Sequence, residues 1–132
     1  MSPKKLRTRK VQPGEGRGRR VVAEKYLEVA TLIDSEDGAA LNVCLGVAVL
    51  AGIAASDAIC SAALGERYAG DDHEAAAELL QRVDPSLGRQ LRDLVSMKNN
   101  SHYGHQMLTA TNRKSALRCA QALVAAARIR QP

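Results

Sequence analysis

The chain has 132 residues and a formal net charge of +5, with 45% hydrophobic but only 2% aromatic residues. This length suits one domain, and the absence of Trp and Phe excludes an aromatic core and the ring platforms that usually stack single-stranded bases. The alanine-rich, aliphatic composition predicts an all-α fold, a compact bundle of four to five helices.

Most of the positive charge lies in residues 1–20, which we expect to form a disordered basic arm before a helical domain at 21–130. The arm has a net charge of +7, so the rest of the chain carries −2. Its Pro and Gly residues and its few apolar ones are typical of disorder. Such an arm either binds the phosphates of RNA or DNA or only keeps the protein in solution. The candidate nucleic-acid-binding residues are Lys4, Lys5, Arg7, Arg9, Lys10, Arg17, Arg19 and Arg20.

Five helices are predicted after the arm from the hydrophobic pattern and from helix-ending residues. Their expected ranges are 20–36, 39–64, 71–83, 86–101 and 112–130. The second is apolar nearly all round, so it is expected at the centre, with Gly46 and Gly52 in close contact with other helices. Asp71 is expected to cap the third helix and Thr111 the fifth, and residues 66–70 are expected to form a polar linker.

The cysteines and the apolar segments favour a cytoplasmic protein. All three cysteines lie in apolar runs, where a thiol acts as a small buried side chain, as expected in a reducing cytosol. No N-terminal apolar run resembles a signal peptide. The uncharged run 41–55 is short for a membrane span, so we expect a core helix and no membrane contact.

The fourth predicted helix carries two reactive side chains on its apolar face. The spacing of Leu87, Leu91 and Leu94 continues to Lys98 and His102. Burying an ammonium group is costly unless it is paired or hydrated, so this face is expected to open onto a cleft, a partner subunit or an anion. The structural alternative is that the lysine stem lies along the surface while the histidine caps the helix end.

Three segments resemble the signature blocks of bacterial HEPN-domain proteins. They are 51–60 (AGIAASDAIC), 70–80 (GDDHEAAAELL) and 94–104 (LVSMKNNSHYG), and the resemblance extends over nearly all of the chain after residue 20. It implies a helical bundle that dimerises and belongs to a toxin–antitoxin system or to RNA-processing nucleases. An antitoxin-like protein is then an expected partner, besides a second copy of the chain and RNA or DNA.

In the nuclease members of that family, an Arg–Asn pair precedes a histidine at the end of a late helix, and Lys98, Asn99 and His102 match these positions. By this resemblance His102 would transfer protons, Lys98 would neutralise a phosphate and Asn99 would hydrogen-bond to it. Lysine is not equivalent to arginine at a phosphate, and the gap to the histidine holds only three residues. The altered motif predicts no robust nuclease activity, with an active metal-independent endoribonuclease toxin and a protein-interaction module as alternatives.

Asp57 is the fourth candidate catalytic residue. It follows a long apolar run, so its carboxylate needs a cationic or hydrogen-bonding partner, for which Lys98 is preferred. The resemblance also implies a polar residue on an earlier helix lining the same cleft. The alternative is a structural ion pair or a solvated helix end. His102 and His105 alone are a weak zinc signal, so neither a metal nor another cofactor is expected.

Overall fold

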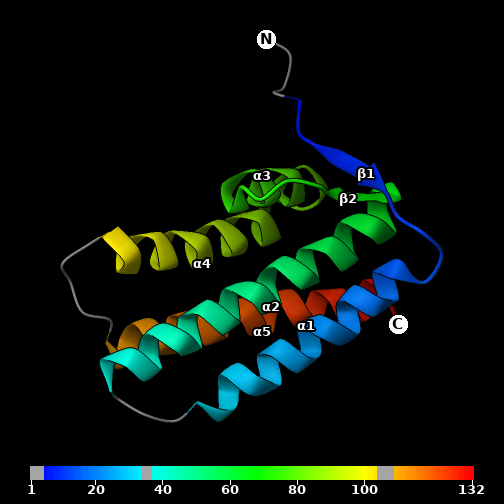
Figure 1. Ribbon diagram of the computed structural model, residues 1–132. Helices are drawn as coiled ribbons and strands as arrows, with labels where there is room; N and C mark the ends of the chain where they lie inside the picture. The colour runs from blue at the N-terminus through cyan, green and yellow to red at the C-terminus, as the bar shows by residue number, and fades with distance from the viewer. Residues whose placement is uncertain (1–4, 34–36, 104–108) are drawn as a thin grey trace.

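The computed structural model describes residues 5–33, 37–103 and 109–132, with the backbone alone for 100–103. This part of the chain is an all-α bundle with a small two-stranded sheet at one end, which confirms the predicted fold class (Figure 1). The elements are β1 (Thr8–Lys10), α1 (Glu15–Leu32), α2 (Gly38–Leu64), β2 (Glu66–Tyr68), α3 (His73–Val83), α4 (Pro85–Tyr103) and α5 (Ala110–Arg130).

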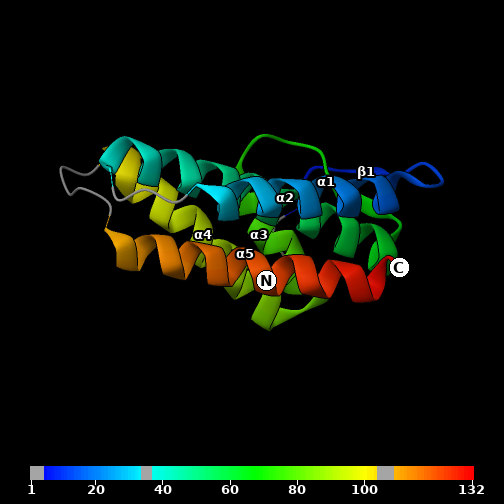
Figure 2. The same ribbon diagram turned by 90° about the horizontal axis from the view of Figure 1, so that it is seen from below.

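Helix α2 forms the core of the bundle, as its nearly continuous apolar sequence predicts. It contacts α1, α3, α4, α5 and β2, and fifteen of its residues are buried. Seen from below, α5 lies along one side of the bundle, with α1 and α2 along the other (Figure 2). Helix α2 is also long and apolar enough to cross a membrane, but 72% of its apolar window is buried inside the protein, as in a core helix.

Gly46 and Gly52, both in the interior of α2, have different surroundings. A Cβ atom at Gly52 would lie 2.9 Å from Cδ2 of Leu94, which confirms the predicted close contact and shows how near α4 approaches. A Cβ at Gly46 would meet nothing within 4 Å, so the same prediction is wrong there. Gly46 is partly buried, but no close helix contact explains it, so the glycine only weakens the helix there.

The caps that begin two helices lie near the predicted positions but not at them. Helix α3 is capped by Asp72 rather than Asp71, because the Asp72 carboxylate accepts hydrogen bonds from the backbone N–H groups of Glu74 and Ala75. Helix α5 is capped by Thr109 rather than Thr111, in a reciprocal pair of hydrogen bonds with Asn112. Each predicted cap lies within two residues of the observed one, because the hydrophobic pattern does not distinguish between neighbouring candidates for the cap.

The N-terminal segment differs most from the sequence prediction, because residues 5–20 are ordered rather than a disordered arm. Strand β1 pairs antiparallel with β2, and α1 already begins at Glu15, after Gly14 with a φ of +82°. Leu6 is only 8% exposed and joins the hydrophobic core. One apolar side chain, a short ladder and several ion pairs therefore hold a segment whose composition is typical of disorder. Residues 1–4, with Lys4, lie outside the described part.

Candidate functional site

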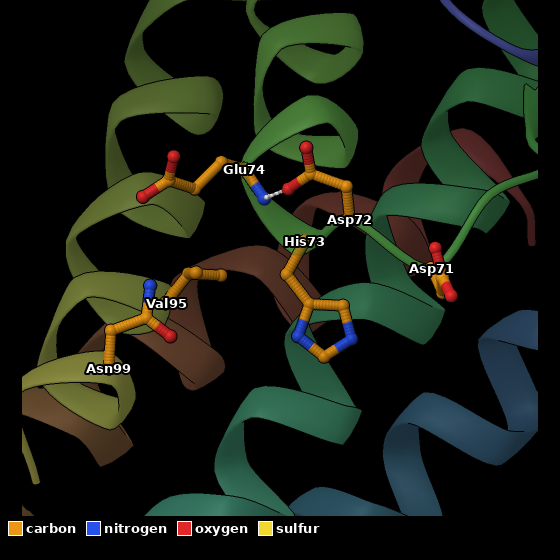
Figure 3. A pocket seen from close by; sticks show the side chains of 6 residues that line it. All are labelled: Asp71, Asp72, His73, Glu74, Val95 and Asn99. Carbon is orange, nitrogen blue, oxygen red and sulfur yellow. Dashed lines mark hydrogen bonds between the residues drawn. The ribbon is translucent and has the colours of Figure 1, made fainter. Parts of the chain in front are cut away.

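Two surface hollows meet at His73, the first residue of α3. The first, here called the α4 hollow, has a volume of about 480 Å³ and is lined by Asp71, Asp72, His73, Glu74, Val95 and Asn99. In Figure 3 the His73 ring extends into this space, and the Asn99 side chain lies across it on α4. The second, here called the arginine hollow, has a volume of about 260 Å³ and includes His73, Asp57 and three arginines in its lining. His73 therefore connects two of the predicted site residues, Asn99 and Asp57.

The surroundings of the His73 imidazole favour its neutral form. Its position is fixed by the cap of α3, where Asp72 Oδ1 accepts a hydrogen bond of 3.0 Å from the backbone N–H of Glu74. Partial burial lowers the pKa of His73, and the positive charge of Lys98 lowers it further, against the two neighbouring aspartates. A neutral imidazole beside a cation has the properties of a general base or of a hydrogen-bonding group for a ligand.

Asp57 holds the second hollow together through two arginines. Its Oδ2 atom lies 3.1 Å from Arg19 Nε and 2.9 Å from Arg67 Nη1, and its side chain is only 7% exposed. Asp57 is therefore paired with Arg19 and Arg67, and not with Lys98, the partner preferred from the sequence. The difference has a physical origin: α1 begins earlier than predicted, which brings Arg19 to Asp57, and the pairing of β1 with β2 brings Arg67 there.

The ion pairs continue from Asp57 to the N-terminal strand. Arg67 Nε lies 2.9 Å from Glu15 Oε2, as an ion pair without hydrogen-bond geometry, and Arg9 Nη2 lies 2.5 Å from the same oxygen. Burial raises the pKa of Asp57, and the two arginines oppose that rise. The hydrogen bond from Arg9 lowers the pKa of Glu15. Charges thus alternate from Arg9 through Glu15, Arg67 and Asp57 to Arg19.

The remaining members of the predicted catalytic set are only partly described. Asn99 is exposed and lines the α4 hollow, and Lys98 is partly exposed on the same turn of α4. The His102 side chain lies outside the described residues, so its position relative to Lys98 stays a prediction. Sequence reasoning did not select His73 or Arg67. His73 had a signal, because it follows the Asp71-Asp72 pair at a helix start, whereas Arg67 lay in an expected linker.

The predicted nucleic-acid-binding residues divide into two groups. Arg9, Arg19 and Arg20 form ion pairs within the fold. Arg20 pairs with Glu24, whose Oε2 also lies 3.4 Å from Arg128 Nε. Besides Arg9, the exposed members are Lys5, Arg7, Lys10 and Arg17, which form the second group. This second group has no ion pair within the described residues, and it surrounds β1 and the start of α1. These side chains are therefore the ones available to phosphates.

Comparison with protein-family models, with curated proteins and with solved structures gives no match for this chain. The HEPN resemblance, and the activity and partners that it implies, therefore stay predictions. Within residues 5–33, 37–103 and 109–132, no three His, Cys, Asp or Glu side chains form a group that could hold a metal ion. The candidate site is accordingly defined by the two hollows and by the basic residues next to them.

Proposed function

We propose that the protein is a HEPN-like, RNA-binding helical bundle of the defence or toxin–antitoxin type, without robust nuclease activity. The observation that supports this most is the connection through His73. On one side of His73 lie Asn99 and Lys98 of the predicted motif, and on the other lie the arginine hollow and the basic N-terminal strand. A strand of RNA that follows this surface meets cations at both ends and a neutral imidazole between them.

RNA binding on this surface is expected to depend on phosphate contacts more than on base contacts. Three arginines line the arginine hollow, and Tyr68 is the one tyrosine among the residues that line the two hollows. Binding that relies on phosphates is weakly sequence-specific and falls steeply with salt. The rest of the chain has a negative net charge, so the basic N-terminal segment is expected to supply most of the attraction.

The test is RNA binding by a charge-reduced variant, Arg7→Gln/Lys10→Gln/Arg17→Gln. All three side chains are exposed, so the fold is expected to survive. The matched control is Arg89→Gln/Lys114→Gln/Arg118→Gln, which removes the same charge from other exposed positions. If three phosphate contacts are lost, the slope of log affinity against log salt falls by about 2 in the first variant alone. Equal slopes in both variants would contradict the proposed surface.

Nuclease activity is a separate question, tested on purified protein with EDTA present. The proposal predicts little cleavage by the natural sequence, because Lys98 lacks the two-pronged contact that arginine makes with phosphate. Lys98→Arg is then expected to raise cleavage, and His102→Ala in that background is expected to abolish it. Rapid cleavage by the natural sequence that depends on His102 would instead establish the endoribonuclease toxin.

An exposed apolar strip on α2 supports a protein partner, either a second copy or an antitoxin-like protein. Val43 is 57% exposed and Leu50 is 40% exposed, and both share a helix face with Gly46, beyond which the space is open. Such a strip on one face of a helix is typical of a contact surface. This is the observation that favours the interaction-module alternative.

The strip is tested by Val43→Glu/Leu50→Glu, with Ile129→Glu as the control at an exposed apolar position of α5. Light scattering after size exclusion is expected to show a dimer for the natural sequence and the control, and a monomer for the double variant. A monomer in all three would contradict the homodimer. Binding of an antitoxin-like protein that the double variant loses would then favour the interaction module.

A further inference from the structure

The arginine hollow contains more hydrogen-bond donors than its own carboxylates use. Arg19 binds Asp57 through Nε, and Arg67 binds it through Nη1. Both Nη groups of Arg19 and Nη2 of Arg67 have no partner among the described residues. The two side chains are 28% and 24% exposed, so these donors are held in place by the ion pairs yet reachable from the hollow.

The charge of the hollow also favours an anion. Arg9, Arg19 and Arg67 line it together with Asp57, and Glu15 pairs with two of these arginines from outside the lining. Together these three arginines and two carboxylates carry a net charge of +1. His73 adds a ring N–H that can donate to the same ligand.

We propose that the arginine hollow is a binding site for a phosphate monoester, held by Arg19, Arg67 and His73. The guanidinium fork matches two phosphate oxygens, whereas an ammonium group acts only as a point charge. Asp57 does not contact the ligand in this arrangement. It is a positioning residue that holds Arg19 by its Nε atom and Arg67 by its Nη1 atom, and it leaves both Nη groups of Arg19 and Nη2 of Arg67 for the ligand.

This proposal extends the proposed function, because the hollow belongs to the same surface, but it can be tested without RNA. Inorganic phosphate is the first probe, titrated while the amide signals of residues 67–73 are followed by NMR. A saturable shift is expected for the natural sequence. Arg19→Lys keeps the charge opposite Asp57 and loses the fork, so the affinity is expected to fall about 10-fold or more. Arg89→Gln, at an exposed position of α4 outside this hollow, is the control and is expected to bind as the natural protein does.

Two further probes identify the source of the phosphate. If the group is the end of an RNA chain, a 5′-phosphorylated oligoribonucleotide binds more tightly than its 5′-hydroxyl counterpart. If it belongs to a free small molecule, a nucleoside monophosphate binds while the two oligonucleotides do not differ. Binding of the 5′-hydroxyl oligonucleotide tests only the proposed RNA binding, because this probe lacks a terminal phosphate. Either proposal can therefore be refuted while the other stands. No saturable shift with any phosphate probe, or equal affinity in Arg19→Lys, overturns the site.

Discussion

Replacing Arg19 and Arg67 with Met together is expected to destabilise the protein more than replacing Asp57 with Asn. The double change leaves a carboxylate that is 7% exposed without its two cations, and an unpaired buried charge costs about 3–5 kcal/mol. Asp57→Asn leaves two guanidinium groups that are 28% and 24% exposed and can turn to water. Its cost is therefore about 1–2 kcal/mol. The asymmetry follows from which member of the group is buried.

The cost of the double change depends on pH, because Asp57 can take up a proton. Burial already raises the pKa of Asp57 above its ordinary value of 3.8, and removal of both arginines raises it further. A carboxyl group whose pKa is raised by folding stabilises the fold fully below its ordinary pKa, and this contribution is lost as the pH rises through the raised value. The double variant is therefore weakest at neutral pH, and adding Asp57→Asn to it is expected to restore stability there.

Urea unfolding followed by circular dichroism measures these differences, provided that the slopes with urea stay equal. Arg89→Met/Arg92→Met removes two exposed arginines and is the control, with an expected effect within about 0.5 kcal/mol. Measurements at pH 7 and pH 5 compare the double variant with the triple variant, so that other titrating groups cancel. A double variant within about 1 kcal/mol of the control, or no recovery in the triple variant, would refute the reasoning.

Two further predictions concern α2 and His73. Gly52→Ala places a methyl group 2.9 Å from Leu94 Cδ2, so overpacking is expected to outweigh the gain in helix propensity by about 1 kcal/mol, whereas Gly46→Ala, in open space, is expected to stabilise by up to about 1 kcal/mol. Thermal unfolding of the pair checks this, and equal shifts would contradict it. Lys98→Gln is expected to raise the pKa of His73, because it removes the positive charge that lowers this pKa, while burial continues to lower it. NMR titration of the imidazole measures it, and an unchanged pKa would place Lys98 too far away to act.

Much of the fold could be predicted because helices leave a local signal. The apolar run of α2 predicted its central position, and Gly65, with a φ of +67°, ends the helix where expected. The short strands left no such signal, because Thr8–Lys10 and Glu66–Tyr68 are too brief and polar to show alternation. Their pairing joins residues 56 to 60 positions apart, and nothing in either segment predicts its partner.

The site was predicted in part, for a related reason. Asp57 stood out because a carboxylate in an apolar run needs a partner, and that inference was sound although the partner differed. The partners Arg19 and Arg67 come from segments that composition assigned to an arm and a linker. Ion pairs with Asp57 of α2 help to hold both segments in place, and composition alone does not reveal such contacts. His73 joins the two hollows only through the packing of α3 against its neighbours.

Amide chemical-shift mapping with a short single-stranded RNA determines whether RNA binds along the surface that runs from the α4 hollow through His73 to the arginine hollow. We expect shifts to concentrate in residues 7–19, 66–76 and 95–99 and to weaken as salt is added. The exposed side of α5 around Lys114 and Arg118 is expected to stay unchanged. Shifts confined to α5, or none at low salt, would contradict the account.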